Sequence, residues 1–147
     1  MLQITIRPIE PKETYAIRQI VLRPNRAIET CFFDGDEVQS TIHFGLYADG
    51  EQAGIISLFK NNSASFEHEN QYQIRGMAVL EHFQKMNFGR ELVTHSEAFL
   101  KSKDTELLWF NARASAVDFY KKLGYHIIGH AFDIPDVGTH YVMWKKI

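Results

Sequence analysis

The chain has 147 residues, with 16 basic and 18 acidic side chains and a formal net charge of −2. This length predicts a single domain over residues 1–147, and a hydrophobic content of 45% is enough to fill its core. The balanced charge argues against a nucleic-acid partner, which would require a concentrated basic surplus. No apolar run reaches the roughly 18 residues of a membrane-spanning helix, and the amino terminus lacks the apolar block of a signal peptide. We therefore expect a cytoplasmic protein with no membrane partner.

The first forty residues predict a strand, a helix and an irregular segment. Alternation over residues 2–7 predicts the strand, and the expected helix covers residues 11–23, with a proline in its first turn and Pro24 after its end. Its buried stripe is expected to consist of Ile17, Ile20 and Val21. Residues 25–39 predict an irregular loop or a short helix, and the acidic run at 34–37 is interpreted as a solvated turn. The alternative is a flap over a ligand pocket, because loops on a rigid scaffold often carry specificity.

A hairpin is predicted next. Alternating stretches at 41–48 and 52–60 flank Asp49 and Gly50, a pair that favours a tight turn between antiparallel strands.

Within the segment before the hairpin, the single cysteine, Cys31, is interpreted as a small buried side chain. One cysteine excludes an internal disulfide and a cysteine-based metal cluster.

The stretch that follows the hairpin predicts a phosphate site. A strand at 73–80 leads through a loop at 81–87 into a helix, and such a loop directs unpaired backbone N–H groups at one point, next to the positive end of the helix dipole. Lys85 and Arg90 flank the turn, and Gly89 allows a ligand to approach the backbone. The helix presents apolar residues at helical spacing, namely Phe88, Leu92, Val93, Phe99 and Leu100. We predict that the turn holds the pyrophosphate of a nucleotide-containing cofactor.

The last third of the chain predicts a buried strand, a helix and a final pair of strands. The strand covers 105–110, and the helix begins at Ser115, where Asp118 completes a capping box, and ends at Gly124. The final strands are expected at 125–132 and 139–145. This order of elements predicts an α+β fold with a mixed sheet and helices on both of its faces.

Two segments resemble motifs of the GNAT superfamily of acetyl-CoA-dependent N-acyltransferases. Residues 84–89, QKMNFG, are similar to the family's Q/R-x-x-G-x-G/A, with Asn87 where the family usually has glycine. Asparagine is the residue after glycine that best tolerates a left-handed backbone, so the loop can keep its shape. Residues 116–125, AVDFYKKLGY, are similar to A-x-x-F/L-Y-x-x-x-G-F/Y, and Arg113 stands where many members carry asparagine. The resemblance implies a central sheet of about six to seven strands in which the fourth and fifth strands splay apart.

The resemblance also implies acetyl-CoA as co-substrate and assigns residues to it by position. The pantetheine arm would contact the backbone of the central strand and Asn111, and the pyrophosphate would lie on the amides of residues 85–90. The expected cofactor-binding residues are Met77, Ala78, Val79, Gln84, Lys85, Met86, Asn87, Phe88, Gly89, Arg90, Asn111 and Ser115. No metal is expected.

The implied reaction is direct attack of an amine on the thioester. By position the Val79 N–H would stabilise the oxyanion, and Tyr120 would act as general acid for the departing thiolate, since an unperturbed phenol is protonated at neutral pH. The alternative for Tyr120 is a packing role beside Phe119. The general base is less obvious, because the central strand offers no carboxylate; the candidate is His140, and the alternative is that this histidine is a hydrogen-bonded surface residue.

These residues favour an N-acetyltransferase acting on a primary amine of a small molecule or a peptide. The alternative is an acyl-CoA-binding module with little or no catalysis. The acceptor pocket would be walled by the first helix, the 25–39 loop and the 132–138 turn, and the acidic cluster of Asp34, Asp36 and Glu37 could attract a cationic amine. His126, His130 and His140 form a weak pattern for zinc. Exposure of residues 141–144 would make a homodimer plausible.

Overall fold

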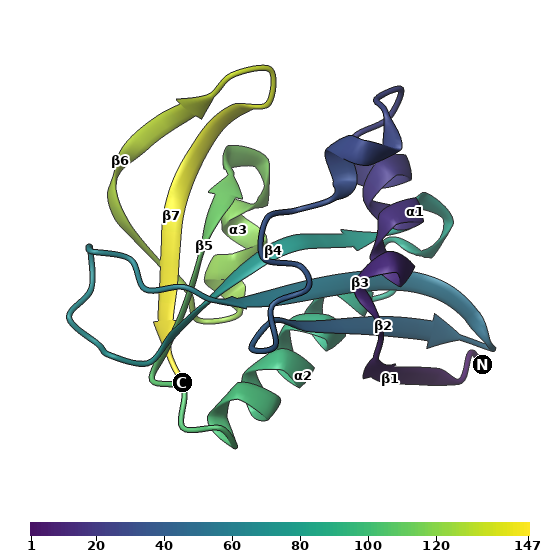
Figure 1. Cartoon of the computed structure of the whole chain (residues 1–147), viewed down its shortest axis with the longest axis horizontal. Coiled ribbons are helices and arrows are strands. Elements are labelled where there is room, and N and C mark those ends of the chain that lie inside the picture. The colour runs from purple at the N-terminus through teal and green to yellow at the C-terminus, as the bar shows by residue number, and fades with distance from the viewer.

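A seven-stranded mixed sheet organises the chain, and the computed structural model describes it over residues 1–147 (Figure 1). All neighbouring strands are antiparallel except the fourth and fifth, which are parallel. The strands are β1 (Ile4–Pro8), β2 (Ile42–Ala48), β3 (Glu51–Lys60), β4 (Gln71–Val79), β5 (Leu107–Arg113), β6 (His126–Ile134) and β7 (Gly138–Lys146), in the spatial order β1-β2-β3-β4-β5-β7-β6. The predicted α+β class and the predicted mixed sheet are confirmed.

The hairpin of β2 and β3 follows from its turn. Asp49 and Gly50 both have positive φ, 49° and 87°, as a two-residue hairpin turn that matches the twist of its strands requires. β3 is buried along almost its whole length because it is covered on both faces. The predicted turn is confirmed.

β4 and β5 pair only at their beginnings and then separate. Gln71, Tyr72 and Gln73 lie opposite Leu107, Leu108 and Trp109, and no pairing continues beyond them. A bulge on β4 accompanies the separation: Gly76 and Met77 together oppose Ile56 of β3, and Gly76 has φ +66°. Bulges bend a strand and increase its twist. The predicted splay of the fourth and fifth strands is confirmed.

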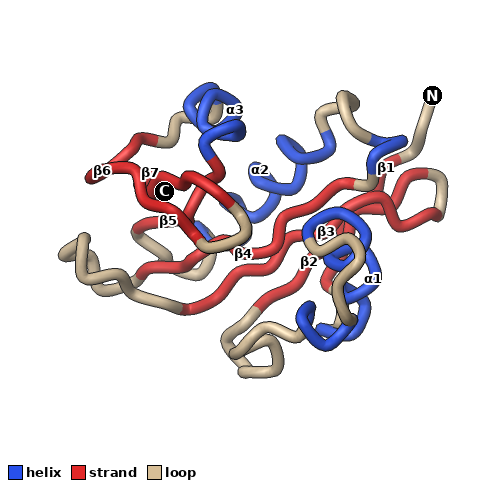
Figure 2. The backbone as a smooth tube through the Cα atoms, turned by 90° about the horizontal axis from the view of Figure 1, so that it is seen from above, coloured by secondary structure: helices blue, strands red, loops and turns tan.

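Helices cover both faces of this sheet (Figure 2). On one face lie α2 (Phe88–Lys101) and α3 (Val117–Lys122), the latter preceded by the 3-10 turn η5 (Ala114–Ala116). On the other face runs a composite helix of η1 (Pro11–Thr14), α1 (Tyr15–Ile17) and η2 (Arg18–Leu22). Two further 3-10 turns are η3 (Ile28–Cys31) and η4 (Glu81–Phe83).

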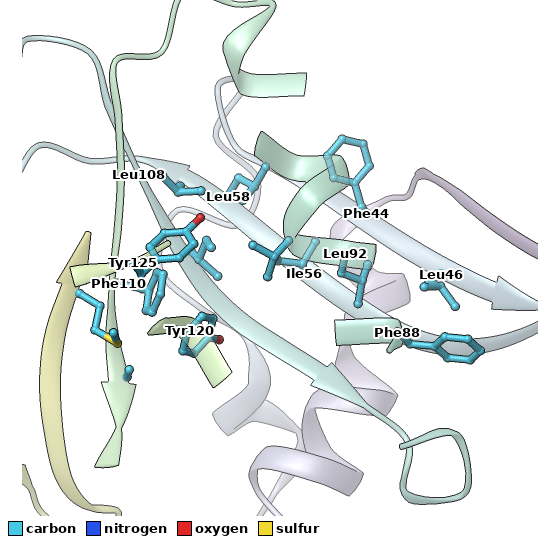
Figure 3. Close-up of a cluster of buried hydrophobic side chains, with 14 of the residues drawn as sticks. Phe44, Leu46, Ile56, Leu58, Phe88, Leu92, Leu108, Phe110, Tyr120 and Tyr125 are labelled. Atoms are coloured by element: carbon cyan, nitrogen blue, oxygen red, sulfur yellow. The ribbon is translucent and has the colours of Figure 1, made fainter. Parts of the chain in front are cut away.

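The main core lies between the sheet and α2 (Figure 3). Phe88, Leu92 and Leu100 of α2 are buried against Ile56 and Leu58 of β3, as the helical spacing of apolar residues predicts. A smaller core on the opposite face joins Ile17 of α1 to Ile55 and Ala78.

The composite helix corrects part of the prediction for residues 11–23. Ile20 is 63% exposed instead of buried, and the buried residues are Thr14, Ile17 and Arg18. The N–H of Arg23 donates to the carbonyl of Arg18 five residues earlier, a π-type hydrogen bond that changes the rotation of the helix surface relative to a regular α-helix. The predicted apolar stripe assumed a regular period, which this segment does not have.

The acidic run at 34–37 is not a purely solvated turn, and that expectation is wrong at Asp36. Asp36 is 5% exposed and accepts bonds from both terminal nitrogens of the fully buried Arg18, at 2.7 and 2.9 Å. A buried charge requires a partner, and the partner is 18 residues away, beyond the reach of local pattern. Cys31 is buried and free, as expected.

Two other expectations at the carboxyl-terminal end are wrong. Ser115 makes no capping bond; it lies in η5, and α3 begins at Val117, because the chain enters the helix through a 3-10 turn. Residues 141–144 do not form an exposed edge, because β7 is paired on both sides with β5 and β6. The free edges of the sheet are β1 and β6.

Candidate active site

A pocket of about 440 Å³ occupies the region where β4 and β5 separate. One part of its wall comes from the face that carries η2, through Leu22 and Arg23, with Phe33 beside them. Another part comes from the opposite face, through Ala116 and Tyr120. The pocket therefore connects the two faces of the sheet through the gap between its central strands.

The loop before α2 presents a run of free backbone donors. None of the amides of residues 85–90 donates a hydrogen bond to the protein. Lys85 and Asn87 both have φ of 65°, in the left-handed region, and Asn87 is the residue that caps α2. Alternating backbone hand turns successive N–H groups toward a common point, which makes a concave anion site. The left-handed Asn87 confirms the expected shape of the loop.

Gly89 connects this loop to the pocket. A side-chain carbon added there would lie 3.4 Å from the ring of Phe119 on α3 and 3.7 Å from the methyl carbon of Met77, which lines the pocket. The start of α2, the surface of α3 and the pocket wall are thus adjacent. An elongated molecule with an anionic group at the loop could extend from there into the gap.

β4 keeps an unpaired backbone edge where it leaves β5. The N–H of Leu80, just after β4, donates to the carbonyl of Ala53 on β3 at 2.9 Å. Backbone groups alternate between the two edges of a strand, so the N–H and C=O of Val79 face the gap. The side-chain amide of Gln84 donates to that carbonyl at 3.0 Å, which ties the loop to the strand and leaves the Val79 N–H without a strand partner.

Tyr120 is the one phenol in the pocket wall. Its side chain is 7% exposed, and its ring packs on Phe110 with 4.2 Å between centroids. Burial raises the pKa of Tyr120 well above that of a free phenol, because the phenolate would lose its hydration. The hydroxyl bonds to no protein group, so a protonated donor faces the pocket.

His140 is also buried in the pocket wall, with 4% exposure, and this differs from the surface-residue alternative. Its Nδ1 lies 2.8 Å from the carbonyl oxygen of Gly138, which can only accept, so Nδ1 carries the proton. In the neutral ring Nε2 is then an acceptor. His140 pairs with Arg113 of β5 across the sheet.

The other predicted binding residues fall into two groups. Asn111 and Met77 line the pocket, whereas Ala78 packs in the smaller core against Ile17. Ser115 is exposed on η5, outside the pocket wall. Gln84, Lys85, Met86, Asn87 and Arg90 are exposed around the loop, and Phe88 is buried in the main core, so only its backbone can contribute.

The histidines of the last two strands do not come together as a metal site. His140 lies opposite Phe132, and His126 lies opposite Trp144, with a break in register between Ile128 and Phe132. No group of three or more His, Cys, Asp or Glu side chains has a geometry that could hold a metal ion.

No helix has both the length and the apolar character needed to cross a bilayer.

The model of the acetyltransferase (GNAT) family matches residues 4–125 of this chain. The chain belongs to the GNAT family. It is therefore an acyltransferase of a family that uses acetyl-CoA. An uncharacterized N-acetyltransferase of Bacillus subtilis (strain 168), YitI, is 33% identical over 144 residues, which are 98% of this chain and 97% of that protein.

Solved structures share the GNAT fold at lower sequence identity. The ribosomal-protein-S18-alanine N-acetyltransferase of Escherichia coli superposes with a TM-score of 0.79 and 20% identity, covering 99% of this chain and 94% of the other. An aminoglycoside 6'-N-acetyltransferase complexed with coenzyme A gives a TM-score of 0.76 and 13% identity, covering 97% and 96%. At these identities the likeness establishes the fold of this GNAT protein and leaves its acceptor open.

Sequence reasoning missed the arginines of this GNAT pocket. Arg23, Arg26, Arg75 and Arg113 all line it, and no aspartate or glutamate does. Asp34, Asp36 and Glu37 line another hollow and are not part of the wall of this pocket, so the suggestion that they attract a cationic amine stays untested. The available signal was Arg75, the one charged residue of the central strand, together with the basic end of the first helix.

Proposed function

We propose that the chain transfers an acetyl group from acetyl-CoA to a primary amine of a small molecule or peptide, by direct attack of the amine on the thioester. The observation that carries the proposal is the pocket through the β4–β5 gap together with the nearby run of free amides at residues 85–90, whose Gly89 lies beside the pocket-lining Met77. Acetyl-CoA supplies the activated acyl group as donor substrate.

The residues present fit a diphosphate and an extended arm. The amides of 85–90 would hold the pyrophosphate, assisted by the positive end of the α2 dipole and by Lys85 and Arg90. The arm would run past Gly89 along the free edge of β4 and contact Asn111 on β5. Met77 and Val79 belong to that edge region, and Ser115 would lie at the outer end of η5.

In the transfer step a carbon–nitrogen bond forms as the carbon–sulfur bond breaks. The Val79 N–H would stabilise the oxyanion that develops on the acyl carbonyl. Tyr120 would give its proton to the departing thiolate, a role supported by the buried and protonated phenol. Nε2 of His140, or a water, would take the proton that the amine loses, and return of a proton from there to Tyr120 through water would restore both groups, leaving the amide and the free thiol as products.

The test is release of free coenzyme A thiol, measured with a colorimetric reagent across a panel of primary amines with acetyl-CoA present. Amine-dependent thiol release at a rate above that of thioester hydrolysis is the expected result. Binding of acetyl-CoA in a calorimeter without thiol release from any amine would instead indicate an acyl-CoA-binding module.

A further inference from the structure

The charged side chains of the pocket are all of one sign. Arg23, Arg26, Arg75 and Arg113 line it together with His140, and no carboxylate does. None of these four arginines forms an ion pair or donates a side-chain hydrogen bond within the protein. A site that received a cationic substrate would need negative charge. This pocket offers the opposite.

Arg75 is the most constrained of these cations. It is half-buried on β4, and its guanidinium lies 4.9 Å from the ring centroid of Phe33 and 5.1 Å from that of Phe59. Aromatic rings beside a guanidinium do not use its N–H groups, which stay free to form paired bonds with a planar anion. Taking a cation partly out of water without a partner is costly, so its unused donors indicate a ligand.

Phe33 gathers three guanidinium groups. Arg18, Arg75 and Arg23 lie 3.9, 4.9 and 5.6 Å from its ring centroid. The only buried carboxylate nearby, Asp36, already accepts two bonds from Arg18 and one from the Phe33 N–H at 2.9 Å. Burial first, and then the charge of Arg18, lower the pKa of Arg75, while Asp36 and the exposed Asp34 oppose the shift in part. A surplus of positive charge therefore remains.

The unpaired positive charge of these arginines is not part of the proposed diphosphate site. The free amides of 85–90 lie at the start of α2, and η2, which leads into Arg23, lies on the opposite face of the sheet (Figure 2). The sheet therefore lies between the two anion-attracting regions. An anion that meets Arg23, Arg26 and Arg75 therefore enters from the acceptor side.

We propose that the acceptor is a small primary amine that carries a carboxylate, such as a free amino acid, and that Arg23, Arg26 and Arg75 bind the carboxylate. This inference rests on the proposed function and names its substrate class. The fork of a guanidinium matches a carboxylate with two parallel bonds. The same positive charge disfavours the ammonium form of the amine, so the acceptor enters as the neutral nucleophile although the pocket holds no carboxylate base. A volume of about 440 Å³, shared with the acyl arm, suits an acceptor of amino-acid size.

The first experiment compares L-methionine, L-phenylalanine and L-glutamate with their methyl esters and their decarboxylated amines by thiol release. The acids should give kcat/KM values roughly 10- to 100-fold above those of the matched esters and amines, the gain of charge-assisted bonds to one carboxylate. O-Phosphoethanolamine, an amine that carries a phosphate, tests whether the pocket prefers phosphate to carboxylate. Faster turnover of it than of the amino acids would overturn the choice of carboxylate.

The second experiment uses Arg75→Gln and, as a matched control, Arg7→Gln. Arg7 lies on β1, stacks on Tyr47 at 4.1 Å and is outside the pocket, so its variant makes the same change of charge elsewhere. Arg75→Gln should raise KM for the acids about 10-fold or more with a smaller change in kcat, and leave the esters and the affinity for acetyl-CoA unaffected. Arg23→Gln should act in the same direction and serves as the second variant if Arg75→Gln fails to fold.

Equal kcat/KM values for the acids, esters and decarboxylated amines would overturn the inference. So would an equal fall in kcat/KM for all three classes in Arg75→Gln. Absence of thiol release from every amine, with acetyl-CoA still bound, would overturn the proposed transfer. In that event calorimetry with the protein–coenzyme A complex decides the present inference separately: binding of L-methionine but not of its methyl ester supports it, and binding of neither or of both rejects it.

Discussion

Tyr120 combines a packing role in the core with the proton-donor role that we propose for it. Its ring is part of the main core, against Phe110 and Tyr125, while its hydroxyl stays unbonded at the pocket. The packing alternative drawn from the sequence and the proposed acid role are therefore compatible. Burial raises the pKa of the phenol, so Tyr120 stays protonated and can donate a hydrogen bond to the departing sulfur.

Tyr120→Phe separates the two roles. The ring remains and the core should stay intact, but the proton donor is lost, so turnover should fall roughly 10²- to 10⁴-fold. Thiol-release kinetics measure the loss, and calorimetry with acetyl-CoA should show little change in affinity. Unchanged turnover in a folded variant would remove Tyr120 from the proposed mechanism.

The Arg18–Asp36 pair is a second residue-scale feature with a measurable consequence. Asp36→Asn removes the charge that neutralises a guanidinium with no exposed surface, and breaking a buried pair from one side costs about 3–5 kcal/mol. Urea unfolding should report a loss in this range. The control is Asp34→Asn, an exposed neighbour without a bonded partner, which should stay within about 0.5 kcal/mol of the parent. Equal stability of both variants would contradict the account of this pair.

At the scale of elements, the junction of β4, the loop and α2 unites several local devices. The bulge at Gly76 and Met77 turns β4 away from β5. The Gln84 side chain bonds to the carbonyl of Val79 and fixes the loop to the strand. Asn87, in a left-handed conformation, lets the chain turn into α2. Each device acts over a few residues. Together they leave a strand edge and the amides at the start of α2 without protein partners.

Asn87→Val tests whether the left-handed conformation matters for binding. A β-branched residue at this φ should strain the loop by about 1–2 kcal/mol and weaken acetyl-CoA binding about 10-fold. Asn87→Gly relaxes the same constraint and should keep the affinity within about threefold of the parent. Calorimetric titration compares the two variants. Equal weakening by both would mean that the asparagine side chain is needed, rather than the backbone shape.

At the scale of the whole molecule, the sheet consists of two well-paired halves that are only weakly paired to each other at the centre. The half from β1 to β4 is continuous, and the half from β5 to β6 is joined to it by three residue pairs of a parallel ladder. A ligand lying between the facing, unpaired parts of β4 and β5 would replace some of the missing contacts between the halves. Binding and stability should therefore be strongly coupled.

Acetyl-CoA at 100 times its Kd should raise the free energy of unfolding by about 2.7 kcal/mol, as linkage requires for a ligand that binds only the folded state. Amide hydrogen exchange should slow at residues 85–90 and at Val79, where free donors become bonded. Protection confined to other parts of the chain would contradict the proposed binding mode, even if the stability rises.

The sequence by itself determined the features that depend on near neighbours. The turn at Asp49 and Gly50, the apolar face of α2 and the left-handed Asn87 all follow from the preferences of residues within about one turn of each other. The two spaced motifs also predicted the family and singled out Tyr120, because such motifs are short segments of chain that can be recognised without the fold.

Only the tertiary structure decided which charges meet. The sequence offered no reason to join Arg18 to Asp36, or to bring Arg23 from a helix end to Arg75 on a central strand, because these pairs are made by packing across the sheet. It also left open that β7 lies between β5 and β6. The physical reason is that burial and strand register depend on contacts between distant segments, whereas local pattern reports only what each segment prefers alone.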